Sequence, residues 1–249
     1  MLNVIKRWIG GGVPGPDWSS VSGWAQRRGH GFKRARDDEG FVVDGQLEGR
    51  PWRLEWGPPQ RAYIAGHELR LRMELGLSSG LQMLLMSRPL MEALERETFE
   101  RYTESNQTLI DVSTPEEMRW LAMFPKVNLE LPKHLRANFA AVASDPPAAA
   151  TWVDAPFAEQ LDKVAAGLLA EQPPFVLMTL RGRLYMRMQL DAPEPDPIGQ
   201  AVDLFEVAAY AAVRVGGGVA EPPPDFPSTA STAWQTDILP EDPKDRGAR

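Results

Sequence analysis

Four charged side chains recur at every second position of the stretch HELRLRMELGL, residues 67–77. They are two carboxylates and two guanidinium groups: Glu68, Arg70, Arg72 and Glu74. Guanidinium groups bind carboxylates and phosphates through paired hydrogen bonds, and a carboxylate beside them can act as an acid or a base. The set is therefore a candidate binding face for an acidic partner or ligand, or else a carboxylate–arginine enzyme site. We assign no residue a catalytic role.

The same charged row is also explained by an ordinary solvated strand. The positions between the charges are apolar, and strict alternation of this kind is typical of a half-buried β-strand. These apolar positions are Leu69, Leu71, Met73 and Leu75. The charged row would then keep the sheet soluble and in register, by pairing with charges of the preceding hairpin at Glu48, Arg50, Arg53 and Glu55. A later strand, RLYMRMQL, repeats the alternation and adds Arg187 to the candidate binding face.

A basic run between residues 27 and 36 is a second candidate site. Its members are Arg27, Arg28, Lys33, Arg34 and Arg36, with Trp24 and Phe32 beside them. Basic and aromatic side chains together are typical of surfaces that bind nucleic acid or anionic lipid. The acidic residues 37–39 follow directly and partly cancel the charge, so a solvated linker is the alternative. The net charge of −7 disfavours a general nucleic-acid binder.

Several kinds of chemistry are disfavoured by what the chain lacks. There is no cysteine, which excludes disulfides and cysteine-based nucleophiles or metal sites. The three histidines, His30, His67 and His134, are far apart in sequence, and GHELR lacks the second histidine of a zinc protease motif. The glycines of GGGVPGP fit neither a phosphate loop nor a dinucleotide fingerprint, and no Gly-x-Ser-x-Gly elbow is present. We predict no cofactor and no metal.

The hydrophobic pattern predicts an α+β fold. Short alternating runs between Phe41 and Arg88 predict an antiparallel β meander, in which LQMLLMS, apolar on both faces, is the most buried strand. Helices follow, beginning after an N-cap at Ser87 and after one at Ser113 or Thr114. A second hairpin, FVLMTL and RLYMRMQL, precedes a helix from Pro197 to about Val215. We expect the helices to lie on one face of the sheet.

One α+β domain is expected over residues 17–215, between two flexible ends. The hairpins EGRPWRLEW and RGRLYMRMQ are alike, which suggests related halves at 17–125 and 126–215, or only a shared preference for the same turn. Residues 1–16 are predicted to be flexible or to form a short amphipathic helix that touches a membrane surface. The proline-rich residues 216–249 are predicted to be disordered, with Trp234, Ile238 and Leu239 as candidates for docking on a partner or on the domain.

Part of the chain resembles a bacterial family known only as a domain of unknown function. The likeness lies in LRANFAAVASDPPAAATWVDAPFAEQLDKVAA followed by FVLMTLRGRLYMRMQL, and in GQLEGRPWRLEWG upstream, which together cover about residues 40–215. The resemblance implies an α+β fold and, in some members, a membrane-proximal element at the N-terminus. It implies no activity and carries no catalytic residue. This sequence departs from the family's pattern in that it lacks any spanning helix.

The sequence therefore predicts a non-catalytic bacterial protein-binding or scaffold module in the cytoplasm. The alternatives are an enzyme with a carboxylate–arginine site and a protein bound peripherally to a membrane. The expected partner is another protein, with weak membrane-surface contact as an alternative and no general nucleic-acid binding. The sequence leaves the oligomeric state open.

Overall fold

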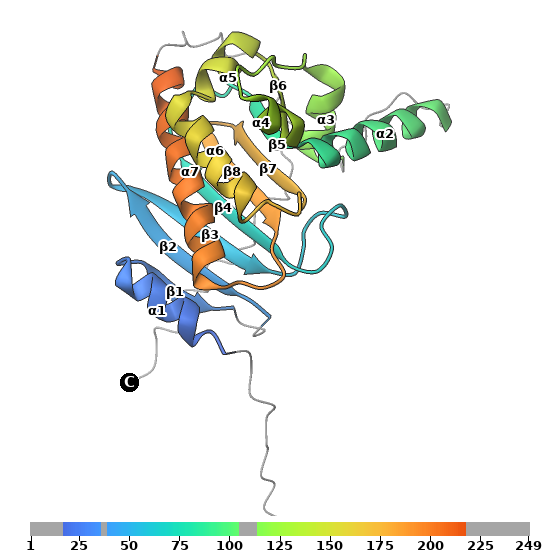
Figure 1. Ribbon diagram of the computed structural model, residues 1–249. Coiled ribbons are helices and arrows are strands. Elements are labelled where there is room, and N and C mark those ends of the chain that lie inside the picture. Colours follow the sequence, from blue (N-terminus) through green and yellow to red (C-terminus); the bar gives the residue numbers. More distant parts are fainter. Residues whose placement is uncertain (1–16, 36–38, 105–113, 218–249) are drawn as a thin grey trace, which may run out of the picture.

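The computed structural model describes residues 17–35, 39–104 and 114–217. Its strands form one eight-stranded antiparallel sheet in the order β1-β2-β3-β4-β8-β7-β5-β6 (Figure 1). The strands are β1 (Gly31–Arg34), β2 (Phe41–Leu47), β3 (Arg50–Gly57), β4 (Glu68–Glu74), β5 (Met83–Ser87), β6 (Phe139–Ala143), β7 (Phe175–Leu180) and β8 (Arg183–Gln189). The helices are α1 (Ser19–Arg27), α2 (Arg88–Glu104), α3 (Glu116–Met123), α4 (Lys133–Asn138), α5 (Pro146–Trp152), α6 (Ala155–Ala166) and α7 (Pro195–Gly216). The predicted α+β class is confirmed.

Two tight hairpins fix the register of the sheet. Glu48 and Gly49 connect β2 to β3, and Arg181 and Gly182 connect β7 to β8; all four have positive φ. Positive φ at both central residues is the type I′ geometry that matches the twist of paired strands. At Gly182 a Cβ atom would lie 2.8 Å from the carbonyl oxygen of Leu77, so a side chain has no room there.

Strands from both suggested halves interleave in the sheet. β5 comes from the segment 17–125, yet it lies between β7 and β6 of the segment 126–215. The two segments therefore build one sheet together. A common origin of the two segments stays a prediction.

The main core lies between the first face of the sheet and the helices α1, α5, α6 and α7. Alternate residues of the strands point into it, including Leu69, Leu71 and Met73 of β4, each at most 3% exposed. The long helix α7 lies along this face (Figure 1) and buries Val202 and Phe205 completely. The predicted burial of Leu69, Leu71, Met73 and Leu75 is confirmed.

The second face of the sheet is covered over only one half. There α2 and α3 pack Leu90, Leu94 and Trp120 on the outward side chains of β5, β6 and β7. The expectation that all helices lie on one face is therefore wrong for α2 and α3. The reason is β5, whose five residues are all buried, so that it needs cover on both sides.

Some element boundaries differ from those expected. Ser87 directly precedes α2, as expected of its N-cap position, but it is also the last residue of β5, and its hydroxyl accepts a hydrogen bond from the Phe175 amide. Pro115 stands at the N-cap of α3, α7 begins two residues earlier than expected, at Pro195, and part of the basic run forms the edge strand β1. None of the helices in the described part of the chain is long and apolar enough to span a bilayer.

We expect Leu71→Ala to destabilise the protein strongly, because Leu71 is 1% exposed between Leu54 of β3 and Met186 of β8. The loss of buried surface and the cavity left behind should cost about 2–5 kcal/mol in the free energy of unfolding. Gln46→Ala, on an exposed position of β2, is the control and should change it by less than about 0.5 kcal/mol. Urea denaturation measures both. Equal effects of the two substitutions would contradict the orientation assigned to β4.

Candidate functional site

The other half of the second face carries charges, and none of the described helices lies over it. None of the residues of β2, β3 and β4 belongs to the apolar cluster under α2 and α3. We call this surface the bare half. It consists of the outward side chains Val42, Asp44, Gln46, Pro51, Arg53, Glu55, Arg70, Arg72, Glu74 and Arg183.

Glutamates hold the arginines of the bare half in place. Arg70 lies 3.4 Å from Glu55 and 3.6 Å from Glu68, and it donates a hydrogen bond to the carbonyl oxygen of Pro58. Glu55 also lies within 4 Å of Arg53 and Arg72. The guanidinium groups are therefore fixed along the surface, while the side chains of Arg53 and Arg72 remain about 30% exposed.

A buried ion pair anchors this surface from beneath. The guanidinium of Arg187 lies 2.7 Å from the carboxylate of Glu68, and both side chains are 0% exposed. Glu68 also accepts a hydrogen bond from the Gln60 amide. Because the antiparallel register sets Arg70 of β4 opposite Arg187 of β8, Glu68 is the anion that both arginines share.

A second buried group joins α3 to the segment between β3 and β4. Arg61 lies 2.6 Å from Glu117 of α3, and the Tyr63 hydroxyl donates a hydrogen bond to the same carboxylate. Burial raises the pKa of Glu117, but attraction to Arg61 and Arg187 and the hydrogen bonds outweigh it, so the pKa lies below its ordinary value. Burial and the charge of Glu117 raise the pKa of Tyr63 well above its ordinary value, which keeps the hydroxyl protonated.

The predicted face residues lie on one side of the sheet but in different environments. Glu68 and Arg187 are buried, Arg70 and Arg72 are half-buried, and Glu74 is exposed and paired with Arg183. Of the expected cross-strand partners, Arg53 and Glu55 share this face. Glu48 lies in the turn, and Arg50 instead donates a hydrogen bond to the carbonyl of Leu75. That these residues bind a partner stays a prediction.

Sequence reasoning missed Arg61, Tyr63 and Glu117. Arg61 and Tyr63 lie in a turn-rich segment, GPPQRAYIAG, with no periodicity to indicate burial. Glu117 has the appearance of an ordinary acid in the first turn of a helix. The one available signal was the placement of an arginine and a tyrosine in an otherwise small and apolar loop.

The basic run is dispersed rather than gathered into one patch. Arg28 pairs with Asp203 of α7 at 2.7 Å, and Lys33 pairs with Asp44 at 3.2 Å. Arg27 and Arg34 are exposed. Arg36 lies outside the described residues, as do Trp234, Ile238, Leu239 and the whole segment 1–16.

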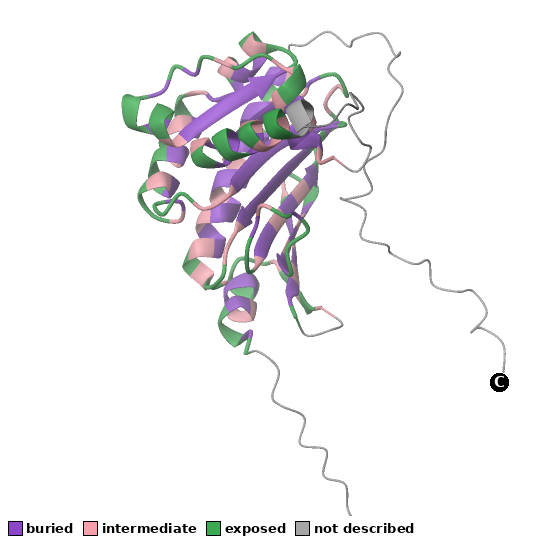
Figure 2. Ribbon diagram, turned by 90° about the vertical axis from the view of Figure 1, so that its right-hand side faces the viewer, coloured by how far each residue is buried: buried purple, intermediate pink, exposed green. Residues whose placement is uncertain are grey.

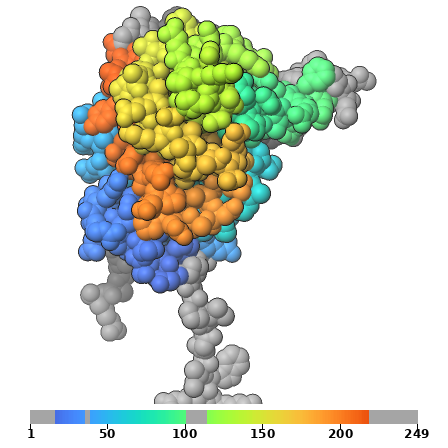
Figure 3. All heavy atoms as spheres, viewed as in Figure 1, coloured from blue at the N-terminus to red at the C-terminus, as the bar shows by residue number. Residues whose placement is uncertain are grey.

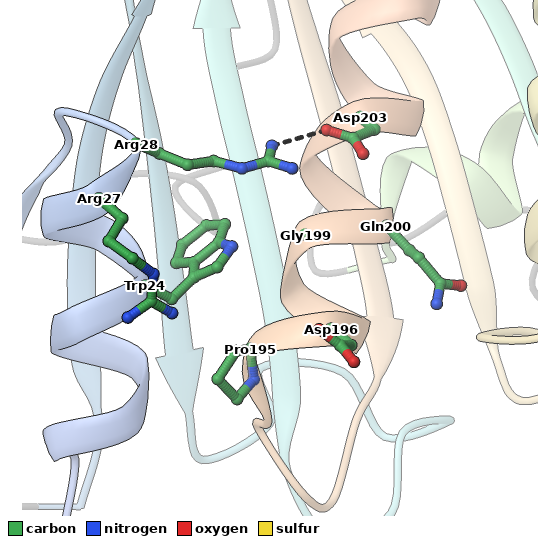
Figure 4. A pocket seen from close by; sticks show the side chains of 8 residues that line it. All are labelled: Trp24, Arg27, Arg28, Pro195, Asp196, Gly199, Gln200 and Asp203. Carbon is green, nitrogen blue, oxygen red and sulfur yellow. Dashed lines mark hydrogen bonds and ion pairs between the residues drawn. The ribbon is translucent and has the colours of Figure 1, made fainter.

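A shallow groove of about 400 Å³ separates α1 from the start of α7 (Figure 4). Arg27, Arg28 and Trp24 line one side of it, and Asp196, Gln200 and Asp203 the other, with the Arg28–Asp203 ion pair crossing above. A smaller pocket of about 40 Å³ lies between the β2–β3 turn and Tyr210 of α7. Neither pocket is lined by the charged residues of the candidate face. Within the described residues, no group of histidines and carboxylates is arranged to hold a metal ion.

Removing one member of the Arg187–Glu68 pair should be costlier than removing both. Glu68→Leu leaves a buried guanidinium without its nearest carboxylate, and we expect a loss of about 3–5 kcal/mol in the free energy of unfolding. Glu68→Leu combined with Arg187→Met should recover part of this loss, since no uncompensated charge remains. Chemical denaturation of the two variants and the unchanged protein completes the comparison. A double variant that is less stable than Glu68→Leu alone would contradict a coupled pair.

Lowering the pH should reduce the stability of the protein, in part because Glu117 becomes protonated. Since the pKa of Glu117 is lower in the folded chain than in the unfolded one, its contribution is present above the unfolded pKa and is lost as the pH falls through the folded pKa. Glu117→Gln cannot titrate. We therefore expect the difference in free energy of unfolding between the two proteins to shrink as the medium is acidified from neutrality. A difference that stays constant down to the acid limit would contradict this assignment.

Comparison with known proteins adds little to this geometry. No protein-family model matches the sequence, and no curated protein matches it either. Among solved structures, the chain is similar to the crystal structure of the mycobacterial trehalose monomycolate transport factor A, TtfA. The two are 9% identical with a TM-score of 0.43, over 79% of this chain and 93% of that one. Agreement at this level carries no argument about function, which has to come from the surface itself.

Proposed function

We propose that the protein is a protein-binding module whose bare half binds an acidic segment of a partner. The observation that carries the proposal is a sheet surface that no described helix covers and that has excess positive charge, on a chain whose net charge is −7. Together with Lys33 beside it on β1, the surface has five basic side chains, Lys33, Arg53, Arg70, Arg72 and Arg183, against three acidic ones, Asp44, Glu55 and Glu74.

Preorganisation of the arginines supports this role. Binding normally costs the side-chain freedom of the groups that become ordered. Arg70 is already held by two carboxylates and a backbone carbonyl, and Arg53 and Arg72 are both held near Glu55. Less freedom is therefore lost when a partner carboxylate replaces water on these guanidinium groups.

An enzyme site at the same residues has less support. The Glu68 and Arg187 side chains have no exposed surface and already neutralise each other. Because both side chains are fully buried, a substrate would have to displace the surrounding structure to reach them. An exposed, partly paired surface favours contact with another macromolecule over turnover of a small molecule.

The proposal is tested with a fluorescently labelled peptide rich in Asp and Glu, whose binding is measured by anisotropy. Arg72→Glu should weaken binding about three- to tenfold, because exposed charge pairs contribute a fraction of a kcal/mol to about 1 kcal/mol each and reversal also adds repulsion. The control is Lys163→Glu, which makes the same change of charge on exposed α6.

Higher salt should weaken the binding of the peptide to the unchanged protein. If Arg72→Glu and Lys163→Glu reduced binding equally, the effect would come from net charge alone and the bare half would not be the binding surface. Circular dichroism and the melting temperature of each variant show that the fold is retained.

A further inference from the structure

The second face of the sheet has the shape of a step. Over β5, β6 and β7 it carries α2 and α3, and we call this part the raised half; within the described residues, no helix lies over the bare half beside it. A packed helix adds a layer about 10 Å thick. Beyond its packed first turns, α2 projects from the side of the molecule (Figures 1 and 3).

The raised half and the bare half have opposite excess charge. Among its side chains described, α2 has four glutamates, Glu92, Glu95, Glu97 and Glu100, against Arg88 and Arg96. Arg88 is directed to the carbonyls of Arg136 and Phe139 at the base of the helix, and Glu95 pairs with Lys126 at 2.8 Å, so Glu92, Glu97 and Glu100 stand against Arg96 among the remaining described side chains. The bare half has an excess of basic side chains, as described above.

Two exposed large apolar side chains lie on the raised half. Three large hydrophobic residues of the described chain are markedly exposed, and two of them lie here: Phe99 of α2 at 68% and Met123 of α3 at 62%. The outward turns of the helices are mostly exposed, whereas the strands are mostly buried (Figure 2). Burial of the Phe99 side chain in a contact would add a favourable hydrophobic contribution. On the bare half, Val42 and Pro51 are apolar and reached by solvent.

We infer that the acidic segment bound by the bare half is α2 of a second copy of this chain. This inference rests on the proposed function and names its partner. A two-fold axis between two facing sheets, along the boundary of β4 and β8, places the raised half of each copy over the bare half of the other. The raised half of each copy then occupies the space over the bare half of the other. Acidic α2 of one copy faces basic β3 and β4 of its partner. The same contact forms twice, as two-fold symmetry requires.

The first test is the mass of the full chain in solution. Sedimentation velocity and light scattering, over a wide range of protein concentration at low and at high salt, should show a concentration-dependent rise from the chain mass of 27.7 kDa towards twice that value. High salt should lower the dimer fraction, since exposed charges are screened. A monomer at every concentration at low salt overturns the inference.

Charge exchange then identifies the two surfaces. Arg72→Glu on the bare half and Glu92→Lys on the exposed side of α2 should each weaken the homodimer about tenfold, because every repulsive contact occurs twice in a symmetric dimer. Mixing the two variants should restore dimers, since each helix then meets a surface of opposite charge. The double variant Arg72→Glu/Glu92→Lys should also form dimers, whereas Lys163→Glu should behave as the unchanged protein.

The outcomes separate this inference from the function on which it rests. If Arg72→Glu weakens binding of the acidic peptide but the unchanged chain stays monomeric, the bare half binds another protein and the homodimer is wrong. If dimers form but neither the mixture nor the double variant restores them, α2 is not the segment bound. If neither peptide binding nor dimer formation depends on Arg72, both proposals fail.

Discussion

The alternation of apolar and charged residues along β4 is the constraint from which the rest of the structure follows. Leu69, Leu71 and Met73 are buried against the helices of the main core, so the charged residues between them must point to the opposite face. Slipping the register by one residue would bury every charge and expose every leucine. The first face is therefore buried, and the charged residues of β4 on the second face cannot be covered by an apolar helix.

Charge at the boundary of the two halves is buried rather than solvated. Glu68 and Arg187 meet where the bare half ends and the apolar half begins, and Arg61 and Glu117 fasten α3 beside them. Buried ion pairs contribute little net stability, because the cost of desolvation offsets most of the attraction, but breaking one is expensive. Their effect here is to specify where α3 and the segment between β3 and β4 must sit, and so to fix the edge of the bare half.

The step on the second face gives the molecule its unusual surface. β5 is apolar on both sides and requires cover by α2 and α3, whereas β2 to β4 are amphipathic and do not. One sheet thus presents a raised, acidic region with exposed Phe99 and Met123 next to a flat, basic one. The homodimer inferred above requires a surface of this shape and charge, and this connects the burial pattern of individual strands to the proposed role in binding.

The sequence by itself determined which side of each amphipathic strand is dry, where the two hairpins turn and where the longest helices run, because these depend on local periodicity and turn chemistry. It also indicated the charged row of β4 as a surface worth testing. Only the tertiary structure decided that β8 lies beside β4, so that Arg187 meets Glu68, and that Glu117 reaches Arg61 from 56 positions away. The placement of helices on both faces also could not be predicted from local sequence patterns. Strand order and helix placement depend on non-local packing, and a hydrophobic period of two or 3.6 residues does not encode that packing.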